Sequence, residues 1–314
     1  MHHLNTSILV TTCKGYGYIM PAFIAMWKKY WSDCPFTLNI CIDGEFRNLA
    51  TTRNINLIPR ENDPGYIDSW IYGLEHIDSE NVILMQDDFI IERKVNNDLV
   101  EAYCNIMNEN QNVGFIRIMP FPEPIGHIHT YNNIQLKQFN KNERYVFSFQ
   151  ACLWKRKLLI EYFKFIIEKA KKEIIKEYGQ NQLKIWAADP KKWLDLFLRD
   201  IHNPEGHGFE LFNLFPEYIY LGFFDTRPKL DKAMICPIPY NPTAIWYGRL
   251  TCAAQRLFKK EQISVETKYS QREHFYHRII PRYYYLFKQL VKILISPFYN
   301  KYKKNNHNYS KNID

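Results

Sequence analysis

The apolar residues of the first half of the chain form short runs that alternate with amphipathic segments. Residues 7–12 and 36–42 are two such runs, and residues 82–85 (Val-Ile-Leu-Met) are apolar throughout. Residues 23–31 instead carry large apolar side chains at spacings of three and four, which is the period of a helix with one buried face. Continuous apolar runs indicate strands that are covered on both faces, and their alternation with helices predicts βαβ units.

Further elements follow the same reasoning. The pattern predicts strands at 56–59, 113–119 and 145–150, and helices at 68–77, 97–108 and 154–178. Asp68 and Ser69 are suitable N-cap residues for the first of these helices. The fold class is therefore an α/β sandwich of Rossmann type with a mostly parallel sheet, in which ligands bind at the carboxyl ends of the strands.

Charge divides the chain into two parts. Residues 268–314 hold ten Lys or Arg against two acids, so this tail carries the whole net charge of +8 and residues 1–267 are close to neutral. A nucleic-acid-binding domain usually carries its positive charge on a folded face, and we expect no nucleic-acid partner. The sequence predicts one domain over 1–267, with a ligand-binding part at about 1–120 and a second, Pro-rich and aromatic part at about 121–267, followed by the tail.

The tail has the composition of a helix that lies on a membrane surface. Lys288 and Lys292 are four residues apart among Leu, Val, Ile and Phe, with Tyr residues before them and further Lys residues after them. This pattern predicts binding to an anionic membrane surface through residues 279–304. The alternative is a helix packed on the preceding domain, followed by a disordered end.

Composition also indicates a compartment. The seven Cys residues are scattered without a C-x-x-C motif, which suits reduced thiols in a cytosolic protein. The N-terminus lacks the features of a secretory signal, and no apolar run approaches the roughly 18 residues that a membrane-spanning helix needs. The expectation is a cytoplasmic protein that is peripheral on the inner face of a membrane.

The most informative chemical feature is Asp87-Asp88, which directly follows the apolar run at 82–85. Two adjacent carboxylates at the end of a buried strand repel each other unless a cation or hydrogen-bond donors offset their charge. Mn²⁺ or Mg²⁺ bridging to the phosphates of a nucleotide would do so, because these ions prefer carboxylate and phosphate oxygens. The alternative is a solvated turn, in which Asp is common.

From about residue 7 to residue 250 the sequence resembles glycosyltransferases of the GT-A fold, of the bacterial or viral capsular and surface-glycan type. The resemblance rests on the first strand and its small-residue loop, a second strand ending at Asp43, the helix with Trp70, the segment 82–89, the strand at 113–119 and the segment 148–155 (Ser-Phe-Gln-Ala-Cys-Leu-Trp-Lys). In such enzymes an Asp-x-Asp motif holds a metal ion on the diphosphate of a nucleotide-sugar. Here Gln86 stands in the place of the first acid.

The resemblance implies a set of site residues. Asp88 is the first expected metal ligand, while Asp87 contacts ribose or sugar hydroxyls or serves as a second ligand, and the loop after the first strand faces the base and ribose. For Asp43-Gly44 a simple turn is an equal alternative. The expected nucleotide-sugar contacts are Thr11, Thr12, Cys13, Lys14, Asp43, Trp70, Gln86, Asp87 and Asp88.

An inverting transferase also needs a carboxylate that takes the proton from the acceptor hydroxyl. The acids of the second part are Asp189, Asp195, Asp200, Glu205, Glu210 and Glu217. Glu210 is the first choice, because its apolar neighbours Phe209 and Leu211 are expected to raise its pKa, and Asp195 is the second.

The sequence thus predicts a metal-assisted hexosyl- or pentosyltransferase that uses a nucleotide-sugar donor and a glycan or lipid-linked acceptor. Two alternatives stay open at this point. One is a nucleotidyltransferase, which shares a nucleotide-binding core with paired acids, and the other is a membrane-associated glycan-binding protein without catalysis.

Overall fold

The computed structural model describes most of the domain and none of the tail. The described residues belong to one compact unit, residues 1–269. They are residues 5–12, 15–43, 54–61, 65–120, 122–143, 145–181, 183–184, 202–225, 236–241, 243–246 and 249–265. Cys13, Lys14, Asp195 and the predicted membrane-binding segment 279–304 lie outside these ranges.

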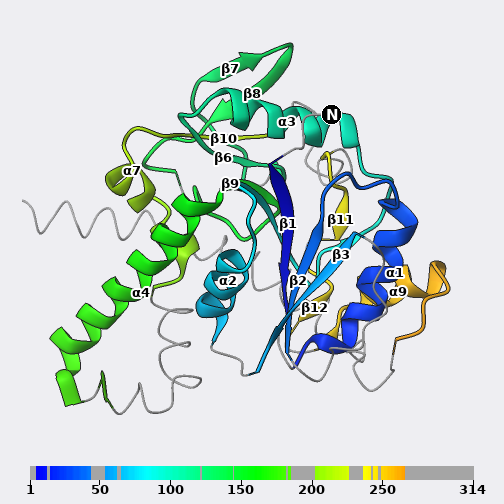
Figure 1. Cartoon of the computed structure of the whole chain (residues 1–314), viewed down its shortest axis with the longest axis horizontal. Helices are drawn as coiled ribbons and strands as arrows, with labels where there is room; N and C mark the ends of the chain where they lie inside the picture. The colour runs from blue at the N-terminus through cyan, green and yellow to red at the C-terminus, as the bar shows by residue number, and fades with distance from the viewer. Residues whose placement is uncertain are drawn as a thin grey trace, which may run out of the picture. The chain divides into compact units, whose positions relative to one another are not determined.

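A mixed sheet of nine strands forms the centre of the described domain (Figure 1). In space the strands follow the order β3-β2-β1-β4-β9-β6-β10-β8-β7. The first four are parallel to one another, and β6 and β10 run in the same direction, while β9 lies antiparallel between β4 and β6. The bounds are β1 Thr6–Thr11, β2 Leu38–Asp43, β3 Ile55–Arg60, β4 Asn81–Gln86, β6 Val113–Arg117, β7 Ile128–Tyr131, β8 Ile134–Gln138, β9 Cys152–Lys155 and β10 Ile219–Gly222.

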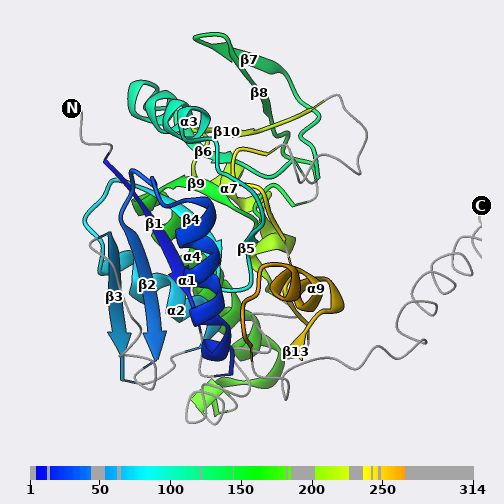
Figure 2. The same cartoon turned by 90° about the vertical axis from the view of Figure 1, so that its right-hand side faces the viewer.

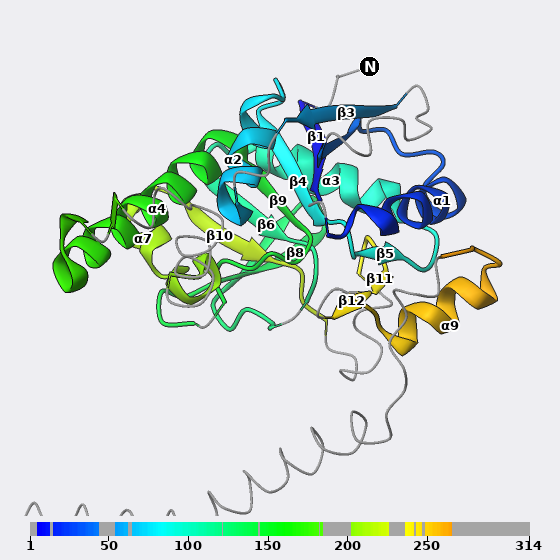
Figure 3. The same ribbon diagram turned by 90° about the horizontal axis from the view of Figure 1, so that it is seen from below.

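Helices cover both faces of this sheet. On one face α1 (Met20–Tyr30), preceded by the 3-10 turn η1 (Gly17–Ile19), and α3 (Asn97–Glu109) share one apolar cluster, and on the other face α2 (Tyr66–Glu75) and α4 (Arg156–Tyr178) share a second (Figures 2 and 3). Successive residues of β4 alternate between the two clusters, with Ile83 and Met85 in the first and Val82 and Leu84 in the second. The continuous apolar run therefore arises from burial on both faces, and the predicted α/β sandwich is confirmed.

Residues 236–260 include the last described elements of the chain, and the first of these elements pairs with β5 (Ile90–Ile91). There β11 (Tyr240–Asn241) pairs with β5, and a short hairpin of β12 (Ile245–Trp246) and β13 (Arg249–Leu250) leads into α9 (Cys252–Lys260). The 3-10 turn η3 (Pro204–His207) and α7 (Glu210–Leu214) lie near α4. None of the helices in the described ranges is long and apolar enough to cross a membrane.

Three expectations about local structure are wrong. Residues 145–150 form turns rather than a strand, and Tyr145 has a φ of 57°; the aromatic side chains at 147 and 149 are nevertheless buried, which produced the alternating pattern. The helix predicted from residue 154 begins at Arg156, because Cys152–Lys155 form β9. The helix predicted at 68–77 begins earlier, at Tyr66, with Gly65 as its N-cap residue.

Candidate active site at the carboxyl edge of the sheet

The ends of four neighbouring parallel strands bring the predicted site residues together. Thr11 of β1 lies in register with Gln86 of β4 on one side and with Cys41 of β2 on the other, and Asp43 at the end of β2 lies in register with Arg60 of β3. Since these strands run in one direction, the segments that follow them leave the sheet at the same edge. This is the edge at which parallel α/β sheets bind ligands.

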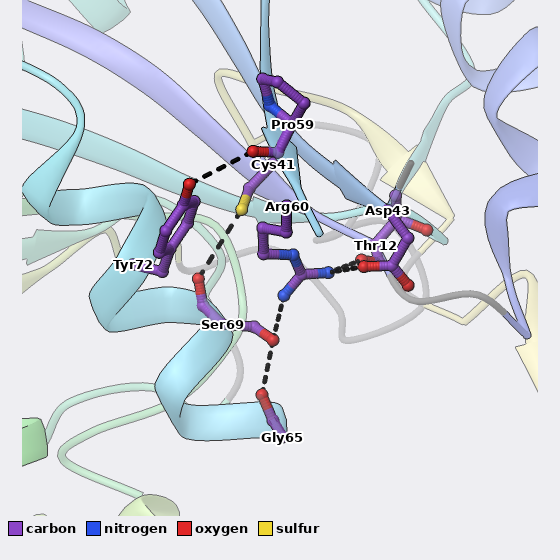
Figure 4. A network of polar contacts seen from close by, with 8 residues as sticks. All are labelled: Thr12, Cys41, Asp43, Pro59, Arg60, Gly65, Ser69 and Tyr72. Carbon is purple, nitrogen blue, oxygen red and sulfur yellow. Dashed lines mark hydrogen bonds and ion pairs between the residues drawn. The ribbon is translucent and has the colours of Figure 1, made fainter. Parts of the chain in front are cut away.

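Arg60 holds one half of this edge together (Figure 4). Its guanidinium is 2% exposed and donates to the Thr12 carbonyl oxygen at 2.5 Å, to Asp43 Oδ1 at 2.8 Å and to the Ser69 hydroxyl. These contacts connect the ends of β1, β2 and β3 with the first turn of α2. A buried guanidinium is tolerated only with a charge partner, and Asp43 supplies that charge.

The contact with Arg60 leaves the second oxygen of Asp43 without a role in the fold. Asp43 Oδ2 is buried and has no hydrogen-bond partner among the described residues. The predicted contact between Asp43 and a nucleoside stays a prediction, and so does the alternative of a simple turn at Asp43-Gly44, because Gly44 lies outside the described residues.

Asp87 and Asp88 lie in a tight turn after β4. The Phe89 N–H donates to the Gln86 carbonyl oxygen at 3.1 Å, and the Phe89 ring stacks on Tyr240 with a centroid distance of 4.6 Å. The late segment that contains Tyr240 continues over the turn, where the backbone N–H of Ile245 donates to Asp88 Oδ2 at 3.5 Å. The turn is therefore fixed from two sides by residues far apart in the sequence.

Burial makes both carboxylates weak acids. Asp87 is 6% exposed and Asp88 9% exposed. Desolvation raises the pKa of Asp87 to about 6, against a smaller lowering by the Thr12 hydroxyl. Desolvation, followed by the charge of Asp87, raises the pKa of Asp88 to about 7. Both pKa shifts mean that the hydrogen bonds and positive charges of the protein do not offset the cost of burying the two carboxylates in their charged form.

Each carboxylate presents one oxygen that the fold does not use. Asp87 Oδ2 and Asp88 Oδ1 are buried without a hydrogen-bond partner in the described part of the chain. Oxygen atoms of this kind fit a hard divalent cation such as Mn²⁺ or Mg²⁺. The described residues hold no group of three or more His, Cys, Asp or Glu side chains that could hold a metal ion.

Tyr66 connects this acidic turn with a third carboxylate. Gln86 Nε2 donates to the Tyr66 hydroxyl at 3.3 Å. The pKa of Tyr66 is raised chiefly by burial and then by the charges of Glu205, Asp88 and Asp87. The charges of Glu205 and of the acid pair thus act on the same hydroxyl group, although more than one hundred residues separate them in the sequence.

Glu205 is held in a defined orientation. Its Oε1 accepts hydrogen bonds from the Phe149 N–H at 2.9 Å and from the Ser148 hydroxyl at 3.2 Å. Its own N–H is capped by Asn203 Oδ1 at 2.9 Å, and Tyr162 of α4 binds the carbonyl oxygen of Pro204 at 2.6 Å. No described residue bonds to Oε2, which leaves one oxygen of a fixed carboxylate for a substrate.

Glu210, the first choice for the general base, has a different environment. Its Oε1 accepts from Lys169 Nζ at 2.6 Å and its Oε2 from Asn213 at 2.9 Å. Burial acts to raise its pKa, but these two donors and the charge of Lys169 together hold the pKa below its ordinary value. The expected rise caused by Phe209 and Leu211 is thus wrong, because the partner on α4 outweighs the apolar neighbours.

The other expected contacts divide into two groups. Thr11 and Thr12 lie at the edge beside the acid pair and are nearly buried, whereas Trp70 is 1% exposed and stacks on Phe149 at 6.1 Å, inside the core. Cys13, Lys14 and Asp195 fall outside the described residues. Tyr66 was not anticipated, because its role depends on packing between α2 and β4 that no local pattern reveals.

No protein-family model matches the sequence, and no curated protein matches it. Solved structures to which the chain is similar include glycosyltransferases, as the resemblance implied. Staphylococcus aureus TarS (residues 1–349) is 15% identical over 50% of this chain and 48% of its own, with a TM-score of 0.33. The Pyrobaculum calidifontis mannosyltransferase PcManGT, solved with GDP-Man and Mn²⁺, is 10% identical over 50% of this chain and 46% of its own, with a TM-score of 0.34.

A nucleotidyltransferase is similar to the same extent. The Francisella tularensis 2-C-methyl-D-erythritol 4-phosphate cytidylyltransferase is 13% identical over 58% of this chain and 87% of its own, with a TM-score of 0.32. The chain spans less than half the length of TarS and of the mannosyltransferase. At these TM-scores and identities the likenesses carry no argument about function, and the ligands named belong to those proteins.

Proposed function

We propose that this protein is a metal-assisted glycosyltransferase, which moves a hexose or pentose from a nucleotide-sugar to a hydroxyl group of a glycan or lipid-linked acceptor. The observation that carries the proposal is the buried acid pair Asp87-Asp88, with one unpartnered oxygen on each carboxylate, at the carboxyl edge of parallel strands. The position suits a nucleotide, and the chemistry suits a divalent cation on its diphosphate.

In this proposal Asp88 and Asp87 hold Mn²⁺ or Mg²⁺. When bound, the cation stabilises the negative charge that develops on the departing diphosphate. The protein contributes a fixed site: Ile245 and the tight turn restrain Asp88, and burial excludes water from the carboxylates. An acid pair held in this way attracts a cation more strongly than a solvated pair, because the local dielectric is low.

Glu205 replaces Glu210 as the proposed general base. Glu205 Oε2 takes the proton from the acceptor hydroxyl while the acceptor oxygen forms a bond to the anomeric carbon. The bond between that carbon and the diphosphate oxygen breaks, so the nucleoside diphosphate leaves and the configuration inverts. Ser148 and the Phe149 N–H keep the carboxylate oriented through Oε1.

The test compares three variants by two measurements. Isothermal titration with nucleoside diphosphates, with and without Mn²⁺, reports binding, and release of nucleoside diphosphate from a panel of nucleotide-sugars reports turnover. Asp88→Asn is expected to remove the metal-dependent binding. Glu205→Gln is expected to keep the binding and to lower turnover by roughly 10²–10⁴-fold, the usual contribution of a general base.

Glu210→Gln is the matched control, because it alters a carboxylate of the neighbouring helix that Lys169 already neutralises. Turnover that falls with Glu210→Gln and survives Glu205→Gln would restore the original choice of base. Release of inorganic pyrophosphate from nucleoside triphosphates would identify a nucleotidyltransferase instead. A protein that binds no nucleotide under either condition would favour the non-catalytic alternative.

A further inference from the structure

One face of the folded domain is strongly basic, independently of the tail. It consists of exposed cationic side chains from the end of α1, the connection between β5 and α3, and the outer side of α9. We call this set the basic face; its members are Lys28, Lys29, Arg93, Lys94, Arg256, Lys259 and Lys260.

Two contacts between different segments connect them. Lys29 of α1 forms an ion pair with Glu261 at the end of α9, and Lys260 lies 3.7 Å from the same carboxylate. The Val95 N–H donates to the Tyr30 carbonyl oxygen at 3.2 Å, which places the connection after β5 beside the end of α1. Figure 3 shows β5 between α1 and α9, so the two helices are joined by the ion pair at their ends.

The acids near this face do not cancel its charge. Glu261 is covered, since its side chain is 4% exposed beneath the ammonium groups of Lys29 and Lys260. Asp33, Glu92 and Asp98 also lie near this face, and Asp33 is 3.7 Å from Lys94. Seven cations and four acids leave a net charge of +3 on this face, in a domain whose overall charge is close to zero.

The construction of α9 explains why its cations point outward. Ala254, Leu257 and Phe258 are buried in the core, and at helical spacing this leaves Arg256, Lys259 and Lys260 on the opposite side. Nothing in the core requires these cations, because Lys259 and Lys260 are exposed and the packing of the helix rests on its apolar residues. Lys259 and Lys260 are therefore available for contacts outside the domain.

We propose that the basic face binds an anionic phospholipid surface, as a second contact in addition to the tail. Charge complementarity supports this partner, since each Lys or Arg close to an anionic membrane adds measurable attraction. The position in the chain supports it too: α9 ends at Lys260, and the basic tail begins only eight residues later, at Lys268.

The experiment measures partition of the full-length protein onto vesicles. The vesicles contain phosphatidylcholine alone or phosphatidylcholine with about one third phosphatidylserine, and bound protein is separated by sedimentation. The test variant is Lys28→Gln/Lys259→Gln/Lys260→Gln. The control variant is Lys157→Gln/Lys172→Gln/Lys176→Gln, which removes three exposed charges from α4.

Both variants keep the tail and lose the same net charge. A difference between their vesicle binding therefore depends on where the charges lie in the domain. At about fivefold for each Lys, the test variant should partition onto anionic vesicles at least tenfold more weakly than the wild-type protein and the control variant. The difference should diminish with added salt. A test variant that binds as well as the control variant would overturn the proposal.

A second arm distinguishes other polyanions. Wild-type protein, test variant and control variant are also titrated with heparin and with duplex DNA at the same ionic strength. If the test variant loses binding to these polymers but not to vesicles, the basic face recognises a soluble polyanion and the membrane proposal is wrong. Circular dichroism of each variant shows whether the fold has been kept.

Discussion

The substitution Asp88→Asn should make the metal-free protein more stable at neutral and alkaline pH. Its amide retains an oxygen that can accept from the Ile245 N–H, so the local hydrogen bond is kept while the charge is removed. In the wild-type protein the pKa of Asp88 rises from 3.8 to about 7, through burial first and the charge of Asp87 second. A group with a raised pKa binds more protons in the folded state than in the unfolded state over this interval.

Burial of Asp88 thus makes the stability of the wild-type protein depend on pH. The free energy of unfolding of the wild-type protein should fall as pH rises from about 4 to about 7, because ionisation is easier in the unfolded chain. Complete ionisation of Asp88 costs at most about 4 kcal/mol, at 1.36 kcal/mol for each pKa unit. We therefore expect Asp88→Asn to gain about 1–4 kcal/mol over wild type at about pH 8, and little at about pH 4.

Urea denaturation in EDTA at the two pH values measures this difference, and Asp78→Asn, which alters an exposed carboxylate, serves as the control. Adding Mn²⁺ at 100 times its dissociation constant should stabilise the wild type by about 2.7 kcal/mol and leave Asp88→Asn unchanged. A variant destabilised equally at both pH values, or one that Mn²⁺ stabilises like the wild type, would refute the account of a desolvated acid pair that accepts a cation.

Three further substitutions test other parts of the edge. Arg60→Met should destabilise the fold by about 3–5 kcal/mol in urea denaturation, because it leaves Asp43 charged and unpaired in the interior; the double variant with Asp43→Asn should recover part of this loss. Gly208→Ala should also destabilise it, by about 1–3 kcal/mol, since an added Cβ would lie 2.5 Å from the Phe147 backbone nitrogen. Tyr66→Phe keeps the ring but removes the hydroxyl that lies among three carboxylates; turnover should fall more than nucleotide affinity, and equal losses in both would place Tyr66 in donor binding.

Sequence patterns were sufficient to predict the strands that are buried on both faces of the sheet. Residues 82–85 form β4, and the acids after it lie at the edge where parallel strands place ligands. The strand β9 was missed because it has only four residues and leads directly into α4. A short apolar run of this kind is compatible with either a strand or the first turn of a helix, and only its pairing with β4 and β6 decides between them.

The choice between Glu205 and Glu210 shows where local reasoning fails. The sequence gives Glu210 two apolar neighbours, but its pKa depends on Lys169, which lies on α4 forty-one residues earlier. Glu205 lacks a comparable local signal and is brought to the site by contacts with Ser148 and Phe149. Both decisive contacts are non-local, so neither could be inferred from spacing along the chain.

The departure from Asp-x-Asp at Gln86 also has a structural explanation. A carboxylate at this position would face the Tyr66 hydroxyl, whose pKa the charges of Glu205, Asp88 and Asp87 already raise. A further like charge would raise the cost of burying all of them. The amide avoids that charge and donates to Tyr66 instead, so it fixes the hydroxyl between the turn and Glu205. In the proposed site the replacement therefore keeps the two acids that would hold the cation, and the amide donates to a hydroxyl group whose pKa Glu205 also raises.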